Sequence, residues 1–510
     1  MKQKILLFII TLIVVLVSCN KNNQATSSIS GIGDITINPY GLTPLSAAYR
    51  TSSINASPIT VTVKGQHGEE DLIHTYPAGY GNEFEIHGLY PECNNTITVN
   101  DGGRIITKNV YVGQMSVNGI NIPSKFTVEV NKLEEDKYPN NPDIYFARVE
   151  YGNVVLGITK NGYVRYYINN IGAEFNVILE KNKICHYTDS GIYSLIGNRM
   201  LTTQGFGLHH DIINVNGNYL ALSLSKWGIE DGLTIINNNS QIVKKLSFGK
   251  LIKDIVYKNN NPDEIKILNQ IVFDEENIHK NSQGQEIGID WFHGNSIVYD
   301  SSTDILYASS RNRGVLAIDY SEWKLIWWMA DDTLSTVVNP DASGASGAIP
   351  YNVHLKDLPS LEAYRVKGDC LNDGPKNQHA LFLLANGNLA MFDNQGDEDN
   401  NVNGSRYVEY KITGTHGNYT AQKNYDYRDP QLYSRYTSDV DYTGERYENV
   451  LITYGRPMTI LEINKENSTE IFKLKININY SGWIALYRAD KLPLYYDEGR
   501  VYSEDYNLKN

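Results

Sequence analysis

The chain has 510 residues, more than one ordinary domain holds, so we expect two or three domains. Its 41% of hydrophobic and 20% of charged residues are typical of a globular protein and argue against intrinsic disorder. The net charge of −13 argues against nucleic acid as a partner, because phosphate binding needs a basic surface. The 37 tyrosines, against 12 phenylalanines, favour a β-rich protein, since tyrosine suits half-buried strands.

The first residues have the pattern of a lipoprotein signal peptide. A short basic region precedes an apolar run over residues 5–17, which is too short to span a bilayer as a permanent helix. Residues 16–19 resemble a lipobox, so we expect a signal peptide over residues 1–18 and lipidation of Cys19. Residues 19–29 are polar and are expected to form a flexible lipidated tether. The pattern predicts a protein anchored to a membrane of the cell envelope, periplasmic or at the outer membrane, without deciding which membrane face holds it.

Cys93, Cys185 and Cys370 are the cysteines that follow Cys19. An odd number in an oxidising compartment permits at most one internal disulfide and leaves a free thiol. No Cys-x-x-Cys is present, which argues against a structural zinc site.

Residues 30–128 are expected to form a small N-terminal β-sandwich. Residues 35–38, 59–63 and 96–99 alternate apolar and polar positions, which is typical of half-buried strands, and glycine-rich turns separate them. No helical period competes with this alternation, so a sandwich is the simplest fold. An edge strand of such a domain is a pairing surface, which leaves a homodimer open.

Residues 129–510 repeat a hairpin unit made of a strand, an Asn-Gly-like turn and a second strand. Copies occur at residues 160–167, 215–222 and 385–393, with variants at 302–308 and 447–453. Asn-Gly supplies two residues of positive φ for a type I′ turn, so each copy indicates a tight hairpin. Four-stranded units repeated around an axis form a β-propeller, and roughly 370 residues at about 45–60 per unit allow six or seven blades. A large array of β-sandwiches is the alternative.

Residues 251–290 and 332–373 interrupt this rhythm. The first stretch is rich in Asn, Asp, Glu and Lys and is expected to hold a short helix or a long blade insertion. Long insertions between propeller strands often shape the mouth of the central site, so we expect both stretches near it.

Three histidines directly precede strand-like runs in three of these units: His210, His293 and His379. In a propeller, loop residues from different blades meet at one end of the axis, so these side chains are expected to converge. Arg311 follows in Ser309-Ser310-Arg311. A neutral nucleophile, proton donors and a fixed positive charge together suit the transfer of a small anionic group.

Several segments resemble the motifs of bacterial aryl-sulfate sulfotransferases, the enzymes that work without a nucleotide sulfate donor. They are residues 290–297, 309–311, 378–380 and 392–394, with residues 38–41 and 88–91 in the N-terminal domain. The resemblance covers nearly all of the mature chain. It implies an all-β protein with a six-bladed propeller, and a ping-pong reaction in which a sulfuryl group passes from an aryl sulfate to a histidine and then to a phenol.

The resemblance also implies residue roles. His379 matches the nucleophile, His293 and His210 match two assisting histidines, and Arg311 matches the sulfate-binding arginine. An arginine presents a planar fork to two sulfuryl oxygens and would depress the pKa of a neighbouring histidine, which keeps it neutral and nucleophilic. A second histidine can protonate the departing phenolate and later deprotonate the incoming phenol. The scheme requires neither a metal nor a cofactor.

Three further residues are expected to contact the substrate. Asn295 matches a polar ligand beside the histidines, and Thr437 matches a threonine of the last blade. His209 stays an alternative to His210, because the chain is one residue short between this pair and Asn216-Gly217.

Other functions remain open. The β-sandwich and the many tyrosines would also suit a non-catalytic surface propeller that binds glycans or proteins. An aryl-sulfate hydrolase is a further alternative, although the Cys/Ser-x-Pro-x-Arg segment of type I sulfatases is absent. A quinone-dependent dehydrogenase propeller is another. The natural donor and acceptor cannot be read from the sequence.

Overall fold

The computed structural model describes residues 31–150, 152–180, 182–225, 230–269, 279–280, 286–287, 290–334, 354–396, 404–444, 448–500 and 502. The expected signal peptide, the tether and Cys19 lie outside these residues. No helix among the described residues is long and apolar enough to cross a membrane.

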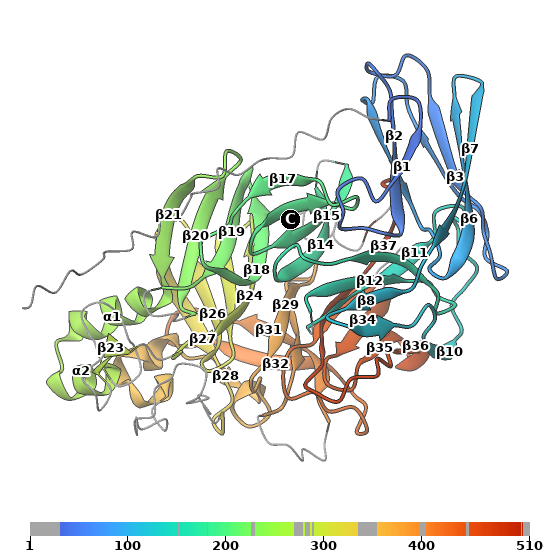
Figure 1. The fold of residues 1–510 in the computed structure, drawn as a ribbon. Coiled ribbons are helices and arrows are strands. Elements are labelled where there is room, and N and C mark those ends of the chain that lie inside the picture. The colour runs from blue at the N-terminus through green and yellow to red at the C-terminus, as the bar shows by residue number, and fades with distance from the viewer. Residues whose placement is uncertain are drawn as a thin grey trace, which may run out of the picture.

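The N-terminal domain consists of two small antiparallel sheets (Figure 1). One has the order β1 (Ile35–Ile37), β2 (Ser46–Arg50), β5 (Glu83–His87), and the other β4 (Leu72–Tyr76), β3 (Ile59–Val63), β6 (Cys93–Asp101), β7 (Arg104–Val112). In β3 the buried positions alternate with half-buried ones, as the period-2 pattern predicts. Apolar residues of both sheets share one core. The expected sandwich is therefore confirmed.

A short hairpin, β8 (Met115–Val117) and β9 (Ile120–Ile122), leads to β10 (Thr127–Asn131). β10 pairs with the outer strand of a propeller blade far along the chain, β36 (Thr469–Lys475). The boundary expected between residues 128 and 129 thus falls inside β10, where the chain already belongs to a propeller sheet.

The described part of the chain then forms six sheets of four or more strands, which are antiparallel except where β28 pairs with β32 in parallel. The first blade comprises β11 (Asp143–Val149), β12 (Val154–Ile158) and β13 (Val164–Ile168). The second comprises β14 (Glu174–Glu180), β15 (Lys183–Thr188), β16 (Gly191–Ser194) and β17 (Arg199–Thr202). The third comprises β18 (Leu208–Val215), β19 (Asn218–Ser223), β20 (Gly232–Asn237) and β21 (Ile242–Ser247). The fourth blade comprises β24 (Gly294–Asp300), β25 (Ile305–Ser310), β26 (Gly314–Asp319) and β27 (Lys324–Met329). The fifth comprises β28 (Lys367–Gly368), β29 (His379–Leu383), β30 (Leu389–Asp393), β31 (Arg406–Thr413) and β32 (Thr420–Arg428). The sixth comprises β33 (Asp439–Thr443), β34 (Asn449–Tyr454), β35 (Thr459–Asn464) and β36.

The six sheets close into a propeller. The last strand, β37 (Leu486–Pro493), pairs with β11 and becomes the inner strand of the first blade. The inner strands β37, β14, β18, β24, β29 and β33 contact one another in a closed ring (Figure 1). A six-bladed propeller is therefore confirmed, and the array of sandwiches is excluded.

The Asn-Gly hairpins are present, but the expected turn type holds at one of them. Asn216 and Gly217, between β18 and β19, both have positive φ, at 52° and 80°, as a type I′ turn requires. At residues 161–162 and 386–387 the glycine has positive φ and the asparagine does not. The repeat thus marks hairpins correctly without determining one common turn.

The first interruption forms two helices between the third and fourth blades, α1 (Phe248–Asn259) and α2 (Pro262–Leu268), and a short strand pair, β22 (His279–Lys280) and β23 (Glu286–Ile287). The side chain of Ser247 caps α1, and Asn261 caps α2 just before a proline at its first position. The second interruption contains the 3₁₀ turns η2 (Leu355–Asp357), η3 (Pro359–Tyr364) and η4 (Asp369–Leu371). Both stretches pack into the core that holds Trp291 and Phe292, directly before His293.

Arg165 joins the sandwich to the first blade. Its buried guanidinium donates to the carbonyl of Gly88 at 2.6 Å, to Glu69 at 2.9 Å and to the hydroxyl of Tyr90 at 2.6 Å. Cys93, Cys185 and Cys370, the cysteines in the described part of the chain, are all free, so none of them forms a disulfide between the two domains.

Candidate functional site

The inner strands of four consecutive blades begin with backbone irregularities that aim side chains at the axis. His210 lies within β18, His293 directly precedes β24 and His379 is the first residue of β29. The pairing of each of these strands shifts by a β-bulge near its start. At His210, His293, Ala380 and Thr437 the φ angle is 58°, 52°, 52° and 57°. Such conformations cost about 1–3 kcal/mol in residues other than glycine and concentrate at functional sites.

His293 is held by two carboxylates. Its Nδ1 forms an ion pair with Asp290 Oδ2 and lies 3.0 Å from Glu230 Oε2. Burial alone would lower the pKa of His293, but the negative charges of Asp290 and Glu230 outweigh it and raise that pKa. His293 is therefore the histidine of this cluster that favours the imidazolium form.

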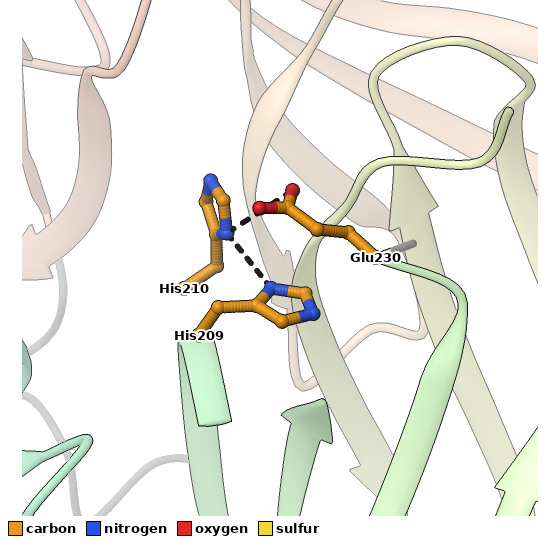
Figure 2. Close-up of side chains that lie close together, drawn as sticks. All are labelled: His209, His210 and Glu230. Carbon is orange, nitrogen blue, oxygen red and sulfur yellow. Dashed lines mark hydrogen bonds and ion pairs between the residues drawn. The ribbon is translucent and has the colours of Figure 1, made fainter. Parts of the chain in front are cut away.

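The two neighbouring histidines of β18 contact each other and Glu230. His209 Nδ1 lies 2.8 Å from His210 Nδ1, which lies 3.7 Å from Glu230 Oε2 (Figure 2). Burial, followed by the charge of His293, lowers the pKa of His209 to about 4 and that of His210 well below its usual value. Both rings are therefore neutral at pH 7, while burial raises the pKa of Glu230 to about 7.

His379 has a defined tautomer. Its Nδ1 lies 2.7 Å from Asn394 Oδ1, and the Asn394 amide is oriented because Nδ2 donates to the carbonyls of Ser434 at 2.7 Å and Thr437 at 3.2 Å. His379 Nδ1 must therefore carry the proton, which leaves the lone pair on Nε2. Burial first, and then the positive charges of Arg311, His293 and Arg488, lower the pKa of His379 to about 3.

Arg311 is attached by its backbone to two of these segments. Its N–H donates to the carbonyl of His293 at 3.0 Å, and its carbonyl accepts from Asn377 Nδ2 at 3.1 Å. Its guanidinium carbon lies 5.5 Å from the ring centre of Tyr436. Arg311 lowers the pKa of His379 as expected from the sequence, although burial contributes more.

The remaining predicted residues differ in what they offer a ligand. Asn295 Nδ2 donates to the carbonyl of Gln378 at 2.7 Å, and its Oδ1 is buried with no hydrogen-bond partner among the described residues. The hydroxyl of Thr437 shares its proton between the carbonyls of Tyr436 at 2.6 Å and Leu486 at 2.7 Å, so only its oxygen remains to accept a bond. Its contact with substrate stays a prediction.

His210, rather than His209, faces the other site histidines. The His210 ring lies 5.0 Å from that of His293, and the charge of His379 also lowers the pKa of His210. Tyr487 of β37 donates its hydroxyl to the carbonyl of His210 at 3.0 Å, which joins the first and third blades. In Figure 2 the ring of His209 lies below that of His210, and the dashed line to Glu230 starts from His210.

Two groups of side chains have the composition of a zinc site: His209, His210 and Glu230, and Glu230, Asp290 and His293, with the ligand atoms of each group within 4.8 Å of one another. The same atoms are joined by the hydrogen bonds and ion pairs described above. This is the geometry of a proton network, and we do not assign these residues as metal ligands.

A cavity of about 530 Å³ runs along the inner strands of the propeller. Asp211 and Arg488, the neighbours of His210 and Tyr487, line it and form an ion pair of 3.2 Å. The histidine cluster therefore lies at one end of the strands that form this axial cavity.

Glu230, Asp290 and Asn394 were not expected to hold the histidines. The sequence could have indicated Asp290, since it stands three residues before His293, and Asn394, since it lies in a segment that supported the resemblance. Nothing in the sequence indicates Glu230, because it follows β19 in a different blade and reaches His293 only in the folded chain.

Comparisons with known proteins agree with this architecture. Residues 127–488 match the family described as Arylsulfotransferase (ASST), and residues 34–112 match an Arylsulfotransferase Ig-like domain. The chain is 29% identical over 192 residues to arylsulfate sulfotransferase AssT of Escherichia coli O6:H1, which covers 35% of this chain and 30% of that protein. It is 27% identical over 205 residues to the AssT of Lelliottia amnigena, and this alignment covers 36% of this chain and 31% of that protein.

The alignments thus span about a third of the length of these two curated relatives, 30% and 31%. Among solved structures, the β-propeller domain of Cps50 (Swd1) from Myceliophteria thermophila is similar with a TM-score of 0.36 at 11% identity, over 70% of this chain and 90% of that one.

Proposed function

Because the chain belongs to the arylsulfotransferase family, we propose that it moves a sulfuryl group from an aryl sulfate ester to a phenol by a ping-pong reaction through His379. The observation that carries the proposal is the state of His379, which is buried, neutral and protonated on Nδ1. Its Nε2 lone pair is then available as a nucleophile beside the positive charge of Arg311.

In the first half-reaction, His379 Nε2 attacks the sulfur of the donor. The S–N bond forms while the S–O bond to the aryl group breaks, and the electron pair of that bond leaves with the phenolate. Arg311 binds two sulfuryl oxygens and offsets the charge that otherwise repels the nucleophile. An assisting histidine gives its proton to the departing phenolate.

In the second half-reaction, a phenol attacks the sulfur of sulfo-His379. The assisting histidine takes the phenol proton, the S–N bond breaks, and its electron pair returns to Nε2. Asn394 keeps the proton on Nδ1 in both steps, so His379 returns in the tautomer that it started with. As in phosphoryl transfer, positioning and electrostatics dominate such a displacement.

His210 and Asn295 complete the set of groups for the transferring sulfuryl group. Asn295 is buried at the start of β24 and its Oδ1 has no hydrogen-bond partner among the described residues, while His210 lies half-buried in β18. The arrangement supports His210 over His209 as the functional member of the pair, because His210 lies next to His293.

The proposal is tested by following 4-nitrophenol release from 4-nitrophenyl sulfate with and without phenol. Strong stimulation by phenol supports transfer, equal release supports hydrolysis, and no release supports a propeller that only binds. Mass spectrometry of peptides from donor-treated protein should detect a sulfated His379. A His379→Asn variant should lose both signals, whereas His416→Asn, which changes an exposed histidine outside the cluster, should keep them. Full activity of His379→Asn would exclude His379 as the nucleophile.

We also propose that the protein works at the surface of an envelope membrane, anchored through lipidated Cys19. The support is the lipobox pattern of residues 16–19. A homodimer stays a prediction.

A further inference from the structure

We propose that Glu230 is a positioning residue that, together with Asp290, keeps a proton on His293 and makes His293 the histidine that protonates the departing phenolate. The inference rests on the proposed sulfuryl transfer, which requires a proton donor without stating which histidine supplies it. It adds two carboxylates that act on the reaction through the ring of His293.

The geometry directs both carboxylates to the same ring atom. Asp290 Oδ2 and Glu230 Oε2 both contact Nδ1 of His293, the second at 3.0 Å. Nδ1 therefore carries a hydrogen throughout, and Nε2 is the atom that can release and regain a proton. A carboxylate on Nδ1 is the usual device for orienting an imidazole and stabilising its cation.

The position of Glu230 is determined by the strand that follows His293. The N–H of Gly294 donates to the carbonyl of Glu230 at 3.0 Å, and the indole of Trp291 donates to Asp231 at 3.2 Å. Residues 230–231 are thus joined to the segment 291–294 at two points. The side chains of Glu230 and Asp290 are only 20% and 24% exposed, so their charges act with little screening.

Two imidazoles in contact cannot both carry a charge at low cost, and the surroundings select one of them. The rings of His210 and His293 have their centres 5.0 Å apart. His210 faces the neutral His209 at 2.8 Å and the more distant Glu230 at 3.7 Å, and the charge of Arg148 opposes its protonation. His293 has both carboxylates, which outweigh the opposing charge of Arg311.

The two carboxylates differ in when they are charged. The ion pair with His293 lowers the pKa of Asp290 despite its burial, so Asp290 is an anion throughout the neutral range. Burial raises the pKa of Glu230 to about 7. Glu230 therefore gains its charge as the pH rises through about 7, and that charge favours the protonated form of His293.

The proton balance closes over one cycle. In the first half-reaction the Nε2–H bond of His293 breaks, its electron pair stays on Nε2, and the proton forms the O–H bond of the phenol. In the second, Nε2 takes the proton of the acceptor phenol. Asp290 stays hydrogen-bonded to Nδ1 and Glu230 stays ion-paired with it, and neither exchanges anything with the substrate.

The test compares Glu230→Gln with wild-type protein on two donors, phenyl sulfate and 4-nitrophenyl sulfate. Phenolate is the poorer leaving group and needs the proton, whereas 4-nitrophenolate leaves readily without it. We expect kcat/KM for phenyl sulfate to fall about tenfold at pH 8 and to stay close to wild type below pH 6, where Glu230 is already uncharged. The 4-nitrophenyl sulfate reaction should change little at either pH.

Two variants serve as controls. Glu230→Asp retains the charge and should restore part of the phenyl sulfate activity at pH 8. Glu322→Gln, which removes the same charge from an exposed turn, should behave as wild type. An equal loss on both donors at both pH values would show a structural role and overturn the assignment.

A second measurement does not depend on transfer. The ring signals of His293 in protein labelled with ¹⁵N-histidine, identified with a His293→Asn variant, report its protonation directly. Glu230→Gln should lower the pH at the midpoint of His293 protonation, and an unchanged midpoint would overturn the inference. If the wild-type protein transfers no sulfuryl group but Glu230→Gln still lowers the midpoint of His293 protonation, the proposed function is wrong. The role of the two carboxylates in keeping His293 protonated is then still supported.

Discussion

His379 Nδ1 lies 2.7 Å from Asn394 Oδ1, and this contact determines which nitrogen of His379 can react. The amide cannot turn over, because its Nδ2 already donates to the carbonyls of Ser434 and Thr437. Asn394 therefore links His379 of the fifth blade, the proposed nucleophile, to the loop that begins the sixth. The reactivity of His379 depends on contacts between blades as well as on its own surroundings.

Replacing Asn394 by alanine should slow the formation of sulfo-His379 about 10²-fold, because the ring loses its fixed tautomer and orientation. The burst of 4-nitrophenol in a single turnover measures this step. Asn394→Asp is the matched variant, since it keeps the acceptor but adds a negative charge that raises the pKa of His379. An unchanged burst in Asn394→Ala would contradict the orienting role.

Arg311→Ala should lower kcat/KM for the aryl sulfate by about 10²–10³-fold, because the charge on the sulfuryl oxygens loses its stabilising partner. Arg311→Lys keeps the charge without the planar fork and should recover only part of the activity. Steady-state kinetics separate the two effects. Arg199→Lys makes the same exchange at an exposed position of β17 and serves as the control for replacing an arginine by lysine away from the site. Full activity of Arg311→Ala would exclude Arg311 as the sulfuryl ligand.

The pH dependence should show no loss of activity near the usual histidine pKa on the acid side. The pKa of His379 is about 3, so its nucleophilic neutral form persists down to about pH 4, while His293, whose pKa is raised, stays protonated above its usual range. The kcat/KM for phenyl sulfate should therefore show no decline on the acid side down to about pH 5, and it should decline only where His293 loses its proton. A decline centred near pH 6.5 on the acid side would show an ordinary, solvated nucleophile.

Exhaustive chelation should leave the transfer rate unchanged. The imidazole and carboxylate atoms that resemble a zinc site contact one another through hydrogen bonds and ion pairs. Activity with 4-nitrophenyl sulfate and phenol is compared before and after dialysis against EDTA, with metal content measured in parallel. A loss of activity that zinc restores would assign the cluster to a metal instead.

Cys19→Ala should release the protein from the membrane fraction of expressing cells without changing its activity in detergent. In the proposed anchor, lipid is attached to this thiol, and burial of its chains in the bilayer provides the anchoring free energy. Fractionation followed by immunoblotting checks the outcome, together with incorporation of a labelled fatty acid. Membrane association that survives the substitution would refute the lipid anchor.

Much of the fold could be predicted because its signals are local. The alternation in β3 and the Asn-Gly hairpin at Asn216 depend on residues that are neighbours in the chain. The hairpin repeat alone allows six or seven blades, because the number depends on how strands far apart in sequence pair, and the family resemblance implies six. The closing contact between β37 and β11 decides it.

The sequence by itself determined which residue types stand at the starts of the inner strands, His210, His293 and His379, because a strand start is recognisable from the hairpin that follows it. Only the tertiary structure decided how these histidines differ. Glu230 approaches one of them from another blade, Asn394 fixes the tautomer of another, and burial keeps His210 and His379 neutral. The protonation state of an imidazole depends on charges and solvent within a few ångströms, and a propeller brings those groups together from segments distant in the chain.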